Sequence, residues 1–275
     1  MSAPASPTAA VLILSALFIF AGFWIYGRQA RRIHSDGGKV VFEQFDLPEL
    51  LMSLVFAGFF SLQVFSATAK AGGKEQPVNI DLVLPSSLIF VMFVVGISGV
   101  MKIRGLSLRS TFGLNRLSPL AVLGWAFGLV LAVIPLAMAA QVITEAAFHG
   151  KVEQQGLVQL FSKMAAQHDY ASMGKIFFSA VVIAPTCEEF LFRGFFYGVW
   201  KRYVGGIVAG FLSCLLFAAF HASLSAFAGL FILAVCLNIA YERTGSLLVP
   251  VCMHALFNLT SLLVVYHQAQ LISGQ

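Results

Sequence analysis

Long apolar stretches separated by short polar segments run along the whole chain. Eight stretches approach the length of about 20 residues that an α-helix needs to cross the hydrocarbon core of a bilayer. They cover residues 9–27, 48–69, 82–101, 119–147, 174–200, 204–221, 224–240 and 246–266. The pattern therefore predicts an all-α fold, a polytopic membrane helical bundle of about eight transmembrane helices. Its longest polar loop is expected at residues 148–173.

Composition supports the membrane assignment and narrows the partners. Of the 275 residues, 59% are hydrophobic and only 11% are charged, and the mean hydropathy is +0.88. Ordinary soluble domains carry about 25% charged residues. The net charge of +5 would suggest nucleic acid as the partner of a soluble protein. Here the basic residues fall in short loops between apolar stretches, so we expect the lipid bilayer as a partner and no nucleic acid.

The basic residues predict an orientation, because cytoplasmic loops are enriched in Lys and Arg. With both termini outside, the inner loops hold eleven Lys and Arg residues and the outer loops hold five. The first apolar stretch is followed by arginines rather than preceded by them, which is the reverse of a signal peptide. We expect it to be a retained anchor. The inner residues are Arg28, Arg31, Arg32, Lys39, Lys102, Arg104, Arg109, Arg116, Lys201, Arg202 and Arg243, and the outer ones are Lys70, Lys74, Lys151, Lys163 and Lys175.

Few ionisable side chains fall inside the predicted spans. Such groups are costly in a bilayer and usually face the bundle interior or a water-filled cavity, so each is a candidate for function. Glu145 lies near the outer end of its span, and we interpret it as structural. The other five lie deeper and are Glu188, Glu189, Arg193, His221 and His254.

The stretch CEEFLFRG, at residues 187–194, places two carboxylates and a guanidinium on one predicted helix. Glu189 and Arg193 are four residues apart, which brings both side chains to one helix face in the favourable order. The planar fork of an arginine suits a buried carboxylate, including bidentate pairing. Glu188 points about 100° away and has no partner on its own helix. The spacing thus predicts a structural Glu189–Arg193 pair and a reactive Glu188.

Two further pairs share helix faces in later spans. FAAFH places Phe217 four residues before His221, and HALFN places His254 four residues before Asn258. A carboxylate and a histidine can hold and deprotonate a water, while a second histidine and an amide can donate hydrogen bonds to an oxyanion. These are the groups that amide hydrolysis requires. Each polar residue alone would equally suit hydrogen bonding between helices.

Other hydrolytic chemistries find less support. No GxSxG or SxxK motif surrounds the serines of the later spans, and HExxH is absent. A metal site made of Glu188, His221 and His254 remains a possible alternative, because two histidines and a carboxylate are a common ligand set. The serines considered are Ser223, Ser225 and Ser261.

The three paired motifs together resemble, in order, those of the CPBP family of CAAX proteases and bacteriocin-processing enzymes, also called the Abi family. This family includes the Ras-converting type of prenyl-protein endopeptidase. The resemblance covers about residues 170–265. It divides the chain into N-terminal membrane helices without a recognised motif, residues 1–165, and a catalytic membrane domain, residues 166–270.

The resemblance implies an intramembrane endopeptidase, of either a glutamic or a metallo type. It assigns water activation to Glu188 and His221 and the oxyanion hole to His254 and Asn258. It leaves Glu189, Arg193 and Phe217 as supporting residues. No cofactor is then required, although zinc or another divalent metal stays open. The expected substrates are membrane-anchored or lipidated peptides or proteins, and the expected location is a bacterial inner membrane.

Two other functions compete with proteolysis. One is a non-proteolytic membrane scaffold or bacteriocin-immunity protein on the same fold. The other is a transporter or proton pathway that uses Glu188 and the histidines as a relay. The absence of an evident inverted repeat argues against transport.

One geometric conflict accompanies the shared site. Counted along straight helices from the inner flank, Glu188 and His254 are about 13 and 11 residues deep, but His221 is about 18 residues deep. His221 would then lie roughly 7–10 Å too far out. A later start or a tilt of the sixth helix, near Gly205 and Gly206, would remove the conflict.

Overall fold

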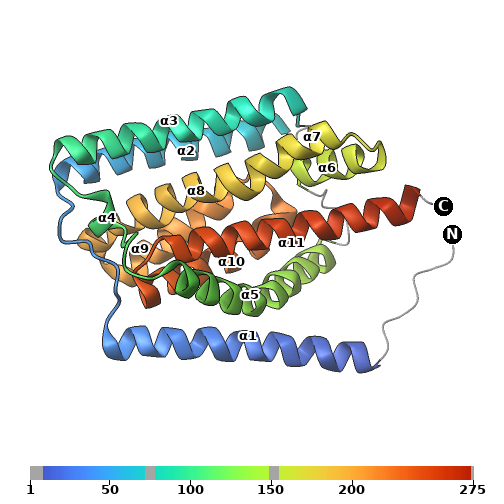
Figure 1. The fold of residues 1–275 in the computed structure, drawn as a ribbon, viewed down its shortest axis with the longest axis horizontal. Helices are drawn as coiled ribbons and strands as arrows, with labels where there is room; N and C mark the ends of the chain where they lie inside the picture. The colour runs from blue at the N-terminus through green and yellow to red at the C-terminus, as the bar shows by residue number, and fades with distance from the viewer. Residues whose placement is uncertain (1–8, 72–77, 149–154, 274–275) are drawn as a thin grey trace.

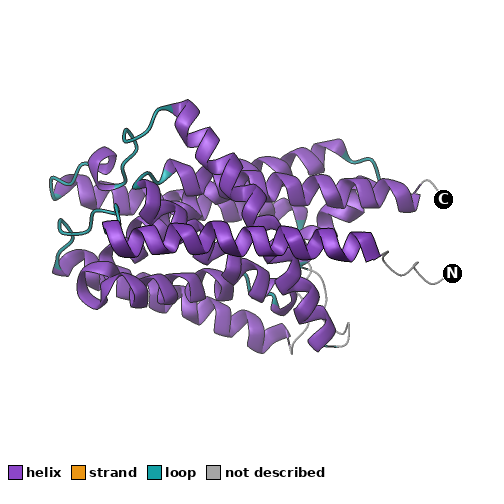
Figure 2. Ribbon diagram, turned by 90° about the horizontal axis from the view of Figure 1, so that it is seen from below, coloured by secondary structure: helices purple, strands orange, loops and turns teal. Residues whose placement is uncertain are grey.

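A computed structural model describes residues 9–71, 78–148 and 155–273 of the chain. Throughout these residues the chain forms helices and loops and no strands, as Figure 2 shows. Seven of the described helical runs are long and apolar enough to cross a membrane. The predicted all-α membrane bundle is therefore confirmed.

The long helices lie roughly alongside one another (Figure 1). Helix α1 spans Ala9–Asp36, α2 spans Leu47–Ala71, α3 spans Ile80–Ile103 and α5 spans Pro119–Ala147. Helix α10 spans Leu224–Thr244 and α11 spans Leu248–Ser273. Helix α5 packs against α1, α10 and α11, whereas α3 packs against the α7–α8 region. The short helix α4, Leu108–Thr111, joins α3 to α5.

The longest helical run, Tyr170–Phe220, has 51 residues. A straight helix of that length would measure about 75 Å, more than twice the bilayer core. Gly205 breaks it, with φ 79° and ψ 162°. This backbone region is essentially restricted to glycine. After the break the chain folds back, so that Gly210 lies beside Tyr197. The two arms are the predicted fifth and sixth spans.

The first arm changes its helical form around the paired carboxylates. It runs through α7 (Tyr170–Phe177), the π-helix η1 (Phe178–Ile183), α8 (Ala184–Glu189), the π-helix η2 (Phe190–Tyr197) and the first residues of α9 (Gly198–Phe220). Pro185, at the start of α8, has no backbone N–H and would clash with the preceding turn of an α-helix. The wider turns of η1 accommodate it. π-helical turns occur frequently at functional sites.

The prediction of one polar loop over residues 148–173 is wrong for its described part. Residues Gly156–Ala166 form helix α6, which packs against α11 and α7. Asp169 then caps α7, where its carboxylate accepts a hydrogen bond from the backbone N–H of Ser172 at 3.1 Å. Hydrogen bonds from the side chain and backbone of Ser172 hold the pKa of Asp169 below its usual value. The stretch is short, so its helical periodicity did not stand out.

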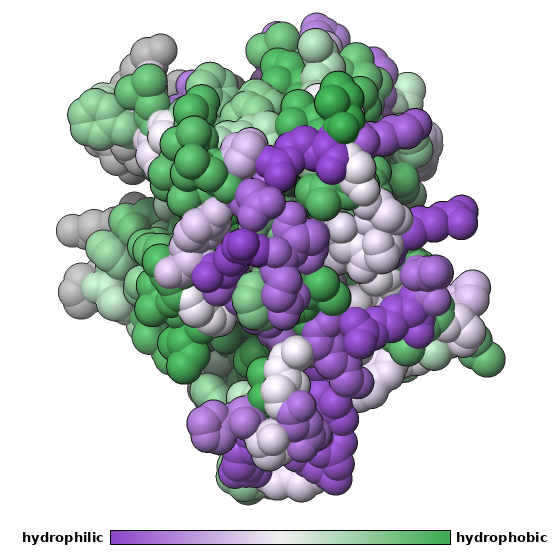
Figure 3. All heavy atoms as spheres, turned by 90° about the vertical axis from the view of Figure 1, so that its left-hand side faces the viewer, coloured by the Kyte–Doolittle hydropathy of each residue, from purple (hydrophilic) through white to green (hydrophobic). Residues whose placement is uncertain are grey.

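Polar and charged residues gather at the end of the bundle that carries α4 and the α1–α2 loop (Figure 3). Arg104 pairs with Asp46 and Glu49, and Arg202 also pairs with Asp46. Lys201 pairs with the buried Glu242. Loops predicted to share the inner side of the membrane thus meet at one end, which we call the basic end. Which compartment this end faces stays a prediction.

Candidate active site

Three helices bring the predicted site residues together inside the bundle. Glu188 and Glu189 end α8, His221 follows the last residue of α9, and His254 lies in α11. The Oε2 atom of Glu188 lies 4.0 Å from Nε2 of His221 and 3.9 Å from Nε2 of His254. The expected depth mismatch of His221 is absent, since its ring reaches Glu188 after the chain folds back at Gly205.

Glu188 is the least restrained of the charged groups. Its side chain keeps 12% of its surface exposed, and that of His221 keeps 15%, whereas Glu189 and Arg193 are fully enclosed. Among the described residues, Oε2 of Glu188 has no hydrogen-bond partner although the atom itself is buried. A buried carboxylate oxygen is expected to be paired, so this one is available to another molecule.

Glu189 and Arg193 form the predicted i, i+4 pair, with Nη1 of Arg193 2.9 Å from Oε1 of Glu189. The contact uses one nitrogen, so the bidentate pairing that arginine permits is not adopted. The guanidinium instead lies over the ring of Phe217, with Cζ 4.3 Å from the ring centre. This stacking adds a cation–π attraction, while Nε and Nη2 of Arg193 have no hydrogen-bond partner among the described residues.

The sequence did not indicate that Glu189 also binds His254. The Nδ1 atom of His254 lies 2.8 Å from Oε1 of Glu189. A carboxylate neutralised by Arg193 only accepts hydrogen bonds, so Nδ1 of His254 carries the proton. The lone pair of Nε2 in neutral His254 therefore faces Glu188. In the imidazolium form, the same nitrogen is a donor.

His221 is oriented in a similar way. Its Nδ1 lies 2.9 Å from the backbone carbonyl of Phe217, one helical turn earlier, and so donates to it. Its Nε2 then faces Glu188 as an acceptor in the neutral ring. Partners on the far side of each imidazole thus fix which nitrogen faces the site.

Phe217 lies at the centre of these groups and is fully buried. Its ring centre is 4.9 Å from that of His221 and 5.7 Å from that of His254. It also packs edge-on against Phe192 of η2 at 5.2 Å. The ring thus packs against both histidines and Arg193, and its supporting role stays a prediction.

Asn258 makes a contact that its spacing did not predict. Its Nδ2 donates to the backbone carbonyl of Ala180 in η1 at 2.8 Å. The side-chain amide has two N–H groups, and this hydrogen bond uses only one of them. No sequence signal marks Ala180, because its contribution is a backbone carbonyl in a π-helical turn.

The remaining candidates lie apart from this cluster. Glu145 is exposed and accepts a hydrogen bond from Gln141 on its own helix. Ser223 and Ser225 hydrogen-bond to each other at the start of α10. Ser261 donates to the carbonyl of Phe257 in its own helix.

A metal ion held by Glu188, His221 and His254 would need these three side chains close together. Zinc ligands about 2.0–2.2 Å from a tetrahedral centre lie roughly 3.3 Å from one another. The separations of 3.9 and 4.0 Å from Glu188 to the two histidines are wider. Over the described ranges, no group of three or more His, Cys, Asp or Glu side chains is arranged to hold a metal. These separations favour the metal-free alternative, and metal dependence stays a prediction.

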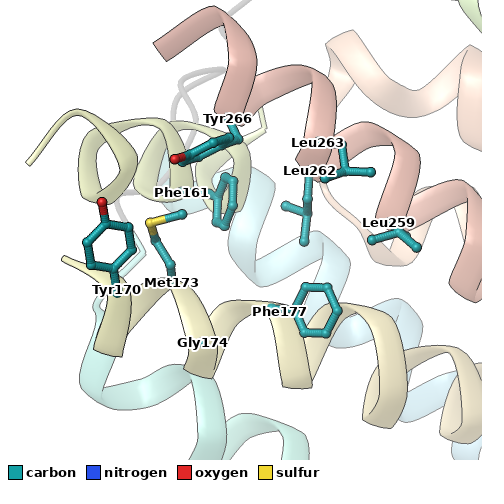
Figure 4. Close-up of a pocket in the computed structure, with 9 residues that line it drawn as sticks. All are labelled: Phe161, Tyr170, Met173, Gly174, Phe177, Leu259, Leu262, Leu263 and Tyr266. Carbon is teal, nitrogen blue, oxygen red and sulfur yellow. The ribbon is translucent and has the colours of Figure 1, made fainter. Parts of the chain in front are cut away.

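An apolar cavity of about 340 Å³ lies between α6, α7 and α11 (Figure 4). Its lining includes Phe161 of α6, Phe177 of α7, and Leu259 and Tyr266 of α11. Leu259 directly follows Asn258, and Phe177 lies three residues before Ala180. Two of the lining residues are thus close in sequence to Asn258 and Ala180, whose hydrogen bond joins α11 to η1.

Comparison with known proteins agrees with the predicted family resemblance. Residues 172–260, about a third of the chain, match the family model described as type II CAAX prenyl endopeptidase Rce1-like. The matched segment begins in α7 and ends in α11, so it contains all the clustered site residues. No curated protein and no solved structure matches the chain.

Proposed function

We propose that this chain, whose residues 172–260 match a CAAX-protease family model, is an intramembrane endopeptidase that uses a water activated by Glu188 and His221. The observation that carries the proposal is the convergence of Glu188, His221 and His254 within the bundle, at separations of 3.9 and 4.0 Å. The substrates are peptides or proteins held in or at the membrane.

The spacing of Glu188 and His221 suits a bridging water. Two acceptor atoms 4.0 Å apart, each about 2.8 Å from a water oxygen, subtend an angle of about 90° at that oxygen. This is close to the angle between the two O–H bonds of water. The water would donate one hydrogen to Oε2 of Glu188 and one to Nε2 of His221. Its lone pairs then point away from both, toward a substrate carbonyl.

In the first chemical step the water oxygen forms a bond to the peptide carbonyl carbon. Glu188 accepts the proton, and the carbonyl oxygen becomes an oxyanion. His254 as an imidazolium would donate to this oxyanion through Nε2, while its other nitrogen stays bound to Glu189. The second N–H of Asn258 would add another donor. Glu188 then returns the proton to the leaving amine as the C–N bond breaks.

The apolar cavity supports a membrane-held substrate. Its lining of aromatic and aliphatic side chains (Figure 4) suits a hydrocarbon group or an apolar side chain. A substrate that places such a group in the cavity would bring its polypeptide toward Asn258. We propose that lipidated or membrane-anchored chains bind this way, in a bacterial inner membrane.

The test compares protein N-termini in membranes from cells that express the wild type or Glu188→Gln at matched levels. Glu145→Gln is the control, because Glu145 is an exposed carboxylate that hydrogen-bonds to Gln141 on its own helix. We expect new N-termini with the wild type and with Glu145→Gln, and none with Glu188→Gln. If the wild type, Glu188→Gln and Glu145→Gln give the same N-termini as one another, or as cells without the protein, the non-proteolytic scaffold is favoured.

A further inference from the structure

A shallow groove of about 320 Å³ lies between α1 and α5 on the outside of the bundle, away from the candidate active site. Ile25 of α1 lines one side, and Gly124, Trp125, Gly128 and Leu129 of α5 line the other. A Cβ atom placed on Gly124 or Gly128 would meet nothing within 4 Å. The two glycines thus keep the groove open without being needed for close helix packing.

The groove opens because the two helices diverge toward the basic end. At Gly22 they are in close contact, since a Cβ there would lie 2.5 Å from the carbonyl oxygen of Ala132. Farther along, the hydroxyl of Tyr26 donates to the carbonyl of Leu129 at 2.8 Å and fixes the pair. Beyond this point α5 presents its glycines, and α1 continues to Asp36.

Cations without acidic partners surround the basic end of the groove. Arg28 lies one turn beyond Ile25 on α1, and Arg32 lies one turn beyond that. In the part of the chain that the structure describes, these two arginines and Lys39, Arg116 and Arg243 make no ion pair with a carboxylate. By contrast, three other cations at this end, Arg104, Arg202 and Lys201, are paired with carboxylates.

Contacts connect these cations into one surface. Arg243 donates from Nε to the side chain of Gln29, which neighbours Arg28, at 3.2 Å. Arg116 donates to the carbonyl of Lys39 at 2.9 Å and packs against Gly245, two residues after Arg243. The positive N-terminal end of α5 lies just after Arg116 and adds to the potential.

We propose that the groove and this basic surface together bind an anionic phospholipid, with an acyl chain along Gly124 and Gly128 and the phosphate among the arginines. Charge complementarity selects the headgroup, because basic pockets between membrane helices bind anionic lipids. The surroundings select a lipid over a soluble phosphate. Trp24, which lies 5.6 Å from the Arg28 guanidinium, and Phe127 beside the groove are both more than half exposed. Such residues belong in the interfacial and apolar layers of a bilayer.

The experiment measures thermal unfolding of the detergent-purified full chain with added phosphatidylglycerol, phosphatidylcholine or glycerol 3-phosphate. Native mass spectrometry then measures how much lipid the chain retains. The test variants are Gly128→Leu, which fills the groove, and Arg28→Gln/Arg243→Gln. The controls are Gly96→Leu, at another open glycine on α3, and Lys102→Gln/Arg109→Gln, which removes the same charge elsewhere at the basic end.

We expect phosphatidylglycerol to raise the unfolding midpoint of the wild type by about 3 °C or more over phosphatidylcholine. Both test variants should lose at least half of this increment and retain less phosphatidylglycerol, and both controls should keep it. An equal loss in the charge control would reduce the effect to general surface electrostatics and overturn the site. Retention of the increment by Gly128→Leu, or an equal effect of glycerol 3-phosphate, would also overturn it.

Discussion

His254 and Arg193 bind the same oxygen atom of Glu189, at 2.8 and 2.9 Å. Glu189 is thus both the counter-ion of a buried guanidinium and the group that fixes which nitrogen of His254 faces Glu188. Two adjacent carboxylates on one helix thereby differ in surroundings: Glu189 is fully enclosed and bound at Oε1 by a guanidinium and an imidazole, whereas Glu188 is partly exposed and lies about 4 Å from two histidines.

The first prediction concerns Glu189 as a counter-ion. Glu189→Ala should lower the free energy of unfolding by about 3–5 kcal/mol, because it leaves the guanidinium of Arg193 buried without its partner. Denaturant unfolding in detergent micelles measures the change. Glu189→Met/Arg193→Met is the matched control, since an apolar replacement of both partners removes the buried charges together. If the double variant loses as much stability as Glu189→Ala, the ion pair is not the reason for the loss.

The second prediction separates Glu188 from its neighbour. Glu188→Gln should lower the cleavage rate by about 10²–10⁴-fold, because the amide cannot accept the proton of the attacking water. The free energy of unfolding should change by no more than about 0.5 kcal/mol, since Oε2 has no partner within the described protein to lose. The cleavage rate and the free energy of unfolding are both measured on the same preparation. A stability loss comparable to that of Glu189→Ala would contradict the division between the two carboxylates.

Much of this arrangement could be predicted from the sequence because membrane helices follow strong local rules. Stretch length predicted the spans, and the i, i+4 spacing predicted the Glu189–Arg193 pair. His221 reaches Glu188 after the chain folds back at Gly205. The sequence indicated only that Gly205 and Gly206 could shift or tilt the start of the sixth helix. A helix ends there because one residue adopts φ 79°.

Other features depend on contacts between distant segments and had no local signal. The hydrogen bond from His254 to Glu189 joins residues 65 positions apart. The bond from Asn258 to Ala180 uses a backbone carbonyl that a π-helical turn presents. Helix α6 was missed because its apolar pattern covers only 11 residues.

A third prediction tests Asn258. Asn258→Ala should lower stability by about 1–3 kcal/mol, because the buried carbonyl of Ala180 loses its donor. If the amide also serves the oxyanion, the cleavage rate should fall by about 10²–10³-fold beyond any loss of folded protein. Thr260→Ala is the control, since Thr260 bonds only within its own helix and is exposed. A rate that falls merely in proportion to the folded fraction would leave Asn258 with a structural role alone.

A fourth prediction concerns metal dependence. Because the separations around Glu188 are wider than those of a zinc site, dialysis against a chelator should leave the cleavage rate unchanged. Elemental analysis of the purified chain should find less than one zinc for every ten molecules, on the order of adventitious metal. Loss of activity on chelation, with recovery on adding back one divalent metal, would reverse this interpretation and return Glu188, His221 and His254 to the role of ligands.

The last prediction tests the break that brings His221 to the site. Gly205→Ala should lower stability by about 1–3 kcal/mol, because alanine is strained at this backbone conformation. Gly206→Ala is the matched control: this glycine begins the second arm in helical geometry, and its added Cβ meets only ordinary contacts. Alanine there should be neutral or stabilising by up to about 1 kcal/mol.

Since His221 lies at the far end of this arm, a shifted break also moves its ring from Glu188. Folded Gly205→Ala protein should therefore cleave substrate more slowly than folded Gly206→Ala protein. Equal rates per folded molecule would show that the position of His221 does not depend on Gly205.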